Sequence, residues 1–244
     1  EKYAKARESG SAEEARKYAQ ASSELTADMV SESKRLLEAM GLPWVQAPAD
    51  GEAQAAFMAR KGDCWGTGSQ DYDSLLFGSP RLVRNLAITG KRKLPNKDEY
   101  VEVKPEVIDL NLLLKALNIT REQLIVLGIL VGTDFDPGGV KGYGPKTALT
   151  FVKNYRDPLK ALEAIRPQLP DVDPVKIYEY FLNPPANQNY AIEFREPDES
   201  LIKEILVKEH DFSEDRVSKA VERLKKAYRE NLRGRQSRID MWFR

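Results

Sequence analysis

Between residues 42 and 69, two short apolar segments flank one amphipathic stretch, and this alternation limits the chain to few folds. LPWVQAP and CWGTGS have the composition of buried strands, whereas DGEAQAAFMARKG between them has that of a helix ending at Gly62. Strand, helix and strand in this order are typical of a βαβ unit with parallel strands. Residues 81–89 and 99–103 are further strand candidates, which would pair as a hairpin around the basic loop GKRKLPNKD. The pattern predicts an α/β fold with a mostly parallel central sheet flanked by helices.

The segments on either side of this sheet are predicted to be helical. Ser11 and Glu14 have the spacing of a capping box, and neither Pro nor Gly interrupts the chain from there to Gly41. This predicts one long helix that ends at Gly41. After Lys104, apolar periodicity predicts helices at residues 108–117, 120–131, 147–155, 158–165, 174–181, 199–209 and 214–230.

The overall charge balance argues, at first sight, against nucleic-acid binding. The 244 residues contain 38 Lys and Arg against 38 Asp and Glu. From Arg216 to the end, however, ten basic residues face three acidic ones, so the zero net charge conceals opposed local charges. No apolar run approaches the length of a membrane span and no stretch has the pattern of a secretory signal. A single cysteine, Cys64, excludes an internal disulfide and favours a reducing cytosol.

Acidic residues follow three apolar elements in pairs. The pairs are Asp50 with Glu52, Asp71 with Asp73, and Asp134 with Asp136. Because ligands bind at the carboxyl ends of strands in open α/β sheets, we expect these side chains to share one pocket. Crowded carboxylates repel each other, and hard oxygen ligands without His or Cys favour Mg²⁺ or Mn²⁺. For each pair taken alone, helix capping or turn formation is the favoured explanation; the three pairs together bring the metal interpretation level with it.

A glycine-rich segment, DFDPGGVKGYGPKTALTFVKNY, precedes a helix whose first turn carries Lys146. Backbone amides at such a turn bind phosphate closely, in the manner of a helix-hairpin-helix that grips a duplex without reading its bases. A plain structural turn is the alternative. Lys91, Arg92 and Lys93 form the basic core of GKRKLP, which is a DNA-binding candidate or a solvated loop.

The C-terminal tail QSRIDMWFR has the sharpest local pattern. Gln236, Ile239, Trp242 and Phe243 occupy its relative positions one, four, seven and eight. Such spacing suits anchoring in a partner's pocket better than packing back onto the tail's own core.

Taken together, these segments resemble the flap endonuclease family of the XPG/Rad2 superfamily, especially its archaeal members. The matching text is QAPADGEAQAA, SQDYDSLLFGSPRLVRNL, ILVGTDFDPGGVKGYGPKTAL, FLNPP, HDFSEDRV and the terminal QSRIDMWF. The resemblance implies a PIN-like 5′ nuclease core joined to a helix-hairpin-helix region. It also implies a Mg²⁺-dependent endonuclease and 5′-3′ exonuclease that cuts branched DNA with a 5′ single-stranded flap, during Okazaki fragment maturation and repair, by two-metal hydrolysis.

The resemblance also assigns residues. The catalytic and metal-binding acids would be Glu52, Asp71, Asp73 and Asp134. Asp50 stands where the family usually has Glu, so a direct ligand role there is less certain. Gly132 would lie beside the DNA. Gly142, Gly144 and Lys146 would grip the duplex, and the tail would bind the sliding clamp PCNA. Two Mg²⁺ ions are expected per intact site, with Mn²⁺ as a substitute.

By the same resemblance, the family's amino-terminal part, with further metal-binding aspartates, lies outside this sequence. The expected parts are the distal leg of an arch with a long core helix (1–40), the α/β nuclease core (41–135), the helix-hairpin-helix and helical region (136–234) and the clamp-binding tail (235–244). We expect a cytoplasmic monomer, associated with the nucleoid during replication, with no membrane contact. The alternative is a fragment that binds DNA and the clamp but cannot cut.

Overall fold

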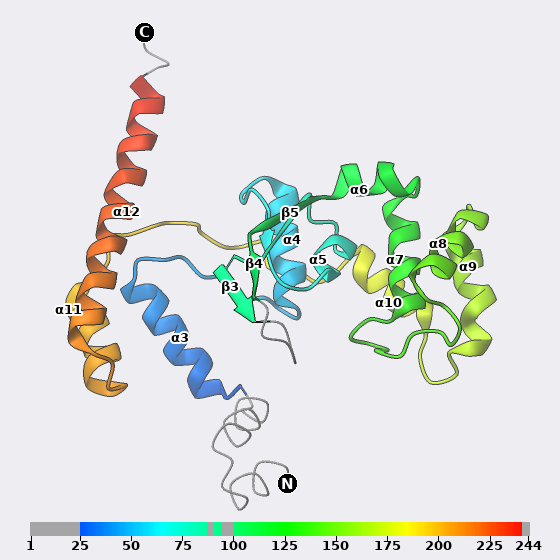
Figure 1. Ribbon diagram of the computed structural model, residues 1–244, viewed down its shortest axis with the longest axis horizontal. Helices are drawn as coiled ribbons and strands as arrows, with labels where there is room; N and C mark the ends of the chain where they lie inside the picture. The colour runs from blue at the N-terminus through cyan, green and yellow to red at the C-terminus, as the bar shows by residue number, and fades with distance from the viewer. Residues whose placement is uncertain (1–24, 87–89, 94–99, 241–244) are drawn as a thin grey trace, which may run out of the picture. The chain divides into compact units, whose positions relative to one another are not determined.

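The computed structural model describes residues 25–86, 90–93 and 100–240, and of residues 91–93, 101 and 233–240 only the backbone (Figure 1). Packing divides the chain into two units. The central unit runs from Val45 to Tyr190, and the terminal unit comprises the residues up to Trp44 and those from Ala191 onward. The four-part division expected from the sequence stays a prediction.

The central unit contains short strands followed by a series of helices. Its elements are α4 (Gly51–Lys61), β1 (Thr67–Gly68), α5 (Asp73–Leu76), β2 (Arg81–Arg84), β3 (Gly90–Lys93), β4 (Tyr100–Val103), β5 (Glu106–Asp109), α6 (Leu110–Leu117), α7 (Arg121–Val131), α8 (Pro145–Asn154), α9 (Pro158–Ile165), the 3₁₀ turn Arg166–Gln168 and α10 (Pro174–Leu182). The α/β class is confirmed.

The main sheet has the order β1-β2-β5 and is mixed, where the sequence pattern predicted a mostly parallel one. Thr67 of β1 is the parallel partner of Leu82 in β2, whereas Leu82 and Ile108 of β5 are antiparallel partners. The reason is the connection: the chain passes from β2 to β5 through a hairpin and not through a helical crossover, so it returns in the opposite direction. Residues 42–48, predicted as a strand, form neither helix nor strand. Proline removes a ladder donor at Pro43, just inside that segment.

The hairpin has its second strand where it was predicted, at residues 100–103, but its first strand lies elsewhere. Its strands are β3 and β4, with Gly90 opposite Val103, so Lys91 to Lys93 belong to a strand and not to a loop. Residues 106–109, part of which was expected to begin a helix, form β5 instead. The helix starts after it at Leu110, where Asp109 Oδ1 accepts a hydrogen bond from Leu112 N at 3.0 Å.

Local capping signals in the central unit are confirmed. Gly62 ends α4 with a φ of 88°, a left-handed conformation that glycine adopts without strain. Thr120 begins α7 with a capping box that includes Gln123. The apolar faces of these helices enter one core, in which Leu82, Ile125 and Phe181 are completely buried. This core holds the loops that carry the acidic residues.

The terminal unit consists of α3 (Ala27–Ala39), α11 (Glu199–Lys203), the π-helix Glu204–Glu209 and α12 (Glu214–Asp240). Thr26 has an extended backbone and caps α3 by accepting from Met29 N, so the prediction of one uninterrupted helix from Ser11 is wrong. Ser11 and Glu14 themselves lie outside the described residues. The core here is small: Ala39, Ile202, Ile205, Val217 and Val221.

Helix α12 continues beyond the predicted end at residue 230 as far as Asp240, so the backbone at Gln236 and Ile239 is helical. Trp242 and Phe243 lie outside the described residues. Within the part of the chain that the structure describes, no helix combines the length and apolarity needed to cross a bilayer.

Candidate metal and nucleic-acid site

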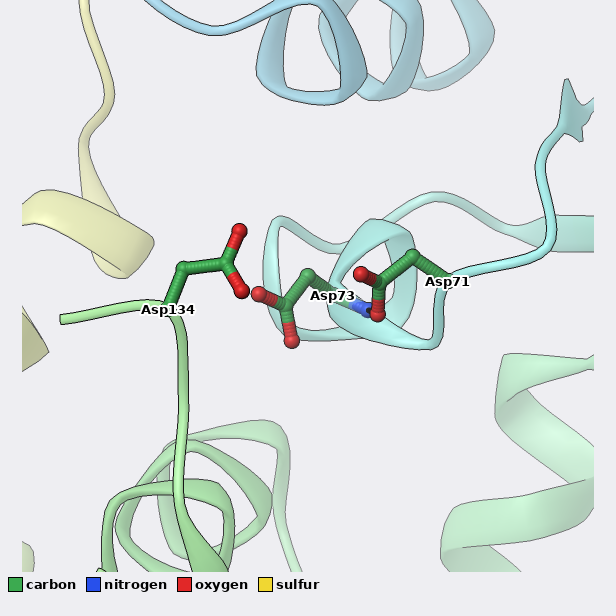
Figure 2. A group of neighbouring side chains, drawn as sticks. All are labelled: Asp71, Asp73 and Asp134. Atoms are coloured by element: carbon green, nitrogen blue, oxygen red, sulfur yellow. Dashed lines mark hydrogen bonds between the residues drawn. The ribbon is translucent and has the colours of Figure 1, made fainter. Parts of the chain in front are cut away.

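Three of the predicted acids meet in the central unit. Carboxylate oxygens of Asp71, Asp73 and Asp134 all lie within 4.8 Å of one another, and we call this group the carboxylate trio. In Figure 2 the carboxylate of Asp134 points toward that of Asp73. Asp71 and Asp73 come from the loop after β1 and the start of α5, whereas Asp134 follows the end of α7. Residues about sixty positions apart in sequence therefore form one acidic cluster.

Hydrogen bonds within the loop after β1 orient two of these acids. Asp71 N donates to Ser69 Oγ at 3.0 Å, and Asp73 N donates to Asp71 Oδ1 at 3.2 Å. The hydroxyl of Ser69 in turn donates to Glu52 Oε1 at the start of α4. Ser69 therefore links Glu52 to the trio. The sequence interpretation did not single out this serine, although its position two residues before Asp71 is the spacing of a local side-chain to backbone turn.

The acids perturb one another electrostatically. The pKa of Asp73 is raised from 3.8 to about 7, mainly by burial and then by the carboxylates of Asp71, Asp134, Glu52 and Asp50, in that order. Burial is also the main cause that raises the pKa of Glu52, opposed by the hydrogen bond from Ser69 and supported by the neighbouring acids. Crowded like charges of this kind are stabilised by a bound cation.

Asp50 has a second role. Its Oδ1 accepts a hydrogen bond from Ala53 N at 2.9 Å, which makes it the N-cap of α4. The capping explanation is therefore correct for Asp50, even though its charge reaches Asp73 and Glu52. The partner of Asp134 in sequence, Asp136, is not one of the trio; its backbone instead bonds to Thr133 through both N and O.

Two buried hydroxyls flank the trio in sequence. Ser74 Oγ follows Asp73 and Thr133 Oγ1 precedes Asp134, and neither has a hydrogen-bond partner among the described residues. An unsatisfied buried hydroxyl costs about 1–3 kcal/mol. The three converging carboxylates make a donor set that suits a hard divalent cation. The residues present therefore fit Mg²⁺ or Mn²⁺.

The predicted DNA-binding glycines differ in their surroundings. At Gly132, with a φ of 124°, a Cβ would lie 2.8 Å from the carbonyl oxygen of Pro137, so close packing of the loop requires glycine. At Gly142 and Gly144 a Cβ would meet nothing within 4 Å. Gly144 is the N-cap of α8 and makes no side-chain capping bond, and Lys146 is exposed in the first turn. The open backbone at α8 leaves room for a phosphate.

The side chains of Lys91, Arg92 and Lys93 lie outside what the structure describes, and so do those of Gln236 and Ile239. Their predicted contacts with DNA and with the clamp stay predictions.

The chain is similar to known nucleases throughout its length. The family model of the XPG I-region matches residues 41–134, which include the whole trio. Flap endonuclease 1 of Aeropyrum pernix is 67% identical over 243 residues, which are 99% of this chain and 69% of that protein. Flap endonuclease 1 of Hyperthermus butylicus is 65% identical over 244 residues, 100% of this chain and 69% of that protein.

Solved structures agree with this relationship. Flap endonuclease-1 from Methanococcus jannaschii superposes with a TM-score of 0.71 at 42% identity, over 88% of this chain and 62% of that chain. The catalytic core of Rad2 in complex with DNA substrate has the same fold, with a TM-score of 0.64 at 22% identity over 90% of this chain and 72% of that chain. The chain thus spans about two thirds of the length of its relatives, and on this identity it belongs to the flap endonuclease 1 family.

Proposed function

We propose that this protein is a structure-specific endonuclease that hydrolyses phosphodiester bonds in branched DNA carrying a 5′ single-stranded flap. The carboxylate trio is the observation that carries this proposal. Three acids from two distant segments converge within 4.8 Å, and crowding and burial raise the pKa of Asp73 to about 7. Such crowding of carboxylates does not stabilise a fold, whereas it is what a site for divalent cations requires.

The trio would hold Mg²⁺, with Mn²⁺ as a substitute. Glu52, which accepts a hydrogen bond from Ser69, would lie near the same cation. Divalent cations bound there would supply an activated water and stabilise the leaving oxygen. The residues of this chain then have the task of keeping the acids in place. The carboxyl group of Asp73, whose pKa is raised to about 7, would bind a cation in its ionised form.

The substrate would be held by its backbone. Gly142 and Gly144 have open space where other residues carry a Cβ, and α8 presents its first amides beside exposed Lys146. A phosphate of duplex DNA fits this combination of amides and positive charge, and such contacts position DNA without reading its sequence. Gly132, Lys91, Arg92 and Lys93 would extend this surface.

The tail would bind a sliding clamp. Gln236, Ile239, Trp242 and Phe243 are the proposed anchors for PCNA, on the strength of their spacing alone. The protein would then act as a monomer at replication and repair sites on cytoplasmic, nucleoid-associated DNA. Removing residues 236–244 should abolish clamp binding and spare cleavage of free substrate; loss of both activities would contradict a separate role for the tail.

The decisive experiment is cleavage of end-labelled 5′-flap DNA in the presence of Mg²⁺ or EDTA. Asp73→Asn removes one charge from the trio and should lower kcat by roughly 10²-fold or more, because stabilisation of several kcal/mol is lost. Asp171→Asn, at an exposed acid of the same unit, is the matched control and should cleave like the wild type. Unchanged cleavage by Asp73→Asn would refute the assignment. Tight binding of the flap without any cleavage by the wild type would favour a DNA-binding module instead.

A further inference from the structure

Two arginines bond to the backbone at the end of helix α5, away from its first residue Asp73. Arg121 Nε donates to Leu76 O at 3.0 Å, and Arg60 Nη1 donates to Phe77 O at 2.9 Å. The Nη2 of the same Arg121 guanidinium donates to Phe181 O at 2.7 Å. One guanidinium therefore bridges the ends of α5 and α10, and another approaches α5 from α4.

Helix α5 depends on such outside support. It spans only Asp73–Leu76, and its N-cap residue, Tyr72, makes no side-chain capping bond. A single turn has almost no stability of its own, because the entropy lost in nucleating a helix exceeds the stabilisation from the hydrogen bonds of one turn. The buried side chains of Leu75 and Leu76 hold α5 in the core, but apolar packing by itself does not fix its rotation or its position along the axis. Directional hydrogen bonds to its last carbonyl groups do.

The surrounding backbone leaves room for the guanidinium of Arg121. Gly78 follows α5 with a φ of 82°, and a Cβ there would lie 2.8 Å from Arg121 Nε and 2.9 Å from its Cζ. Further along α7, a Cβ at Gly128 would lie 2.9 Å from Leu76 Cδ1. Two glycines thus let α7 and its arginine approach α5 closely.

Placing two like-charged guanidinium groups close together without acidic partners is unfavourable for the stability of the fold. Among the residues that the structure describes, their hydrogen-bond partners are carbonyl groups, and neither forms an ion pair with an acid. Burial lowers the pKa of Arg121, and the like charge of Arg60 lowers it further. Arg60 is the more exposed of the two, so Arg121 should matter more.

Each element held by the arginines carries an acid at a different point. Helix α4 has Glu52 in its first turn and Arg60 near its end, α5 begins at Asp73, and α7 begins at Arg121 and is followed by Asp134. An inward shift or a rotation of α5 would therefore change the spacing of Asp73 from both neighbouring acids. Metal sites tolerate little such error, because ligands displaced by about 1 Å bind poorly.

We propose that Arg121, assisted by Arg60, is a positioning residue that sets the geometry of the carboxylate trio by holding the carbonyl end of α5. This inference rests on the proposed metal-dependent function of the trio. Among the described residues, Arg121 forms its hydrogen bonds with the carbonyl groups of Leu76 and Phe181 and with none of the trio acids, so it acts through the backbone.

The test is a titration of the protein with Mn²⁺ in the absence of DNA, at a temperature where circular dichroism shows each variant folded. Arg121→Lys keeps the positive charge but loses the fork that joins two carbonyls, and it should raise the dissociation constant roughly 3- to 10-fold, below the 10- to 100-fold typical of direct outer-shell partners. Arg60→Lys should have a smaller effect in the same direction. Arg156→Lys, at an exposed arginine of the same unit, is the matched control.

Gly78→Ala provides a second route, because its methyl group would clash with the guanidinium of Arg121 while the arginine itself is kept; the φ of 82° also strains alanine there, so this variant too is titrated only where it is folded. Weaker Mn²⁺ binding by both variants, with kcat lowered and KM for DNA unchanged, supports the proposal. Wild-type Mn²⁺ affinity in both Arg121→Lys and Gly78→Ala, even with lower melting temperatures, would show a merely structural role and overturn the proposal.

Asp73→Asn in the same titration separates the positioning role from the proposed metal-dependent function. If this variant binds Mn²⁺ normally, or if the wild type binds none, the proposed function fails and the positioning role with it. If only Asp73→Asn loses affinity, the positioning role alone fails.

Discussion

The two units of the molecule use charge in opposite ways. In the central unit, negatively charged side chains are crowded together and partly buried, and the pKa of Asp73 rises to about 7. In the terminal unit, charges are paired: Glu199 accepts from Lys225 at 2.9 Å, and its hydrogen bonds to Lys225 and Lys203 lower its pKa to about 2. Arg35 forms two hydrogen bonds to Glu209, at 2.7 and 2.9 Å.

The cores differ as well. Buried side chains from β2 and from helices α4 to α10 form one large cluster in the central unit, whereas five buried residues form the cluster of the terminal unit. A large core offsets the electrostatic cost of an acidic site, since each fully buried aliphatic side chain contributes about 1.5–3 kcal/mol. The unfavourable crowding of acids thus lies in the unit with the larger apolar core. In the terminal unit, ion pairs at the surface supplement a small core.

Matched cavities in the two cores test this comparison most strongly. Ile125→Ala and Ile205→Ala each truncate an isoleucine that is at most 2% exposed, the first in the central unit and the second in the terminal unit. Each should destabilise its own unit by about 2–5 kcal/mol, measured by hydrogen exchange of peptides from that unit. Only Ile125→Ala, on the helix that leads to Asp134, should also weaken Mn²⁺ binding. Equal weakening by Ile205→Ala would show that the units do not behave separately.

The pH dependence of stability should have opposite signs in the two units. Asp73 has a folded-state pKa of about 7, above its ordinary 3.8, so the folded protein without metal holds a proton that the unfolded chain has released. The central unit should therefore lose stability as pH rises from about 4 to 7, and Mn²⁺ should reverse the loss.

Glu199 shows the converse, because its folded-state pKa of about 2 lies below the ordinary 4.5. The terminal unit should keep this contribution above pH 4.5 and lose it as pH falls toward 2. Hydrogen exchange of each unit over this pH range gives the measurement. A central unit that becomes more stable between pH 4 and 7 without metal would contradict the repulsion inferred at the trio.

The smallest expected effect comes from the ion pair on α3. Arg35→Met removes both hydrogen bonds to Glu209 on an exposed surface. We expect a slight fall in the melting temperature at low ionic strength, which disappears at about 1 M salt because exposed pairs are screened. Lys176→Met, at an exposed lysine of the central unit, serves as the control. A large, salt-independent fall would mean that the pair carries more of the terminal unit than the comparison allows.

Sequence reasoning succeeded where the cause is local. The caps at Asp50 and Thr120 and the glycine end of α4 depend on a few neighbouring residues, so the helices they bound were predictable. The acids of the trio were also predictable, because each follows an apolar element and the family resemblance selects them. Pairing of strands was not, since the antiparallel position of β5 depends on a hairpin whose first strand, β3, was assigned to other residues.

Residues that act across long distances in sequence escaped prediction altogether. Arg121 bonds to carbonyl groups 45 and 60 positions away, and Ser69 bonds to Glu52 across 17 positions. No periodicity or spacing signals such a partner, because a polar side chain has the same appearance in sequence whether it is solvated or reaches a buried carbonyl group.

The sequence alone thus determined the types of chemistry available to this protein, namely which acids, which glycines and which helices it has, because these follow from composition and short-range spacing. Only the tertiary structure decided that the sheet is mixed, that Ser69 links Glu52 to the trio, and that guanidinium groups hold α5 in register. The physical reason is that convergence depends on how a shared apolar core orients elements that are distant in the chain, and no local rule contains that orientation.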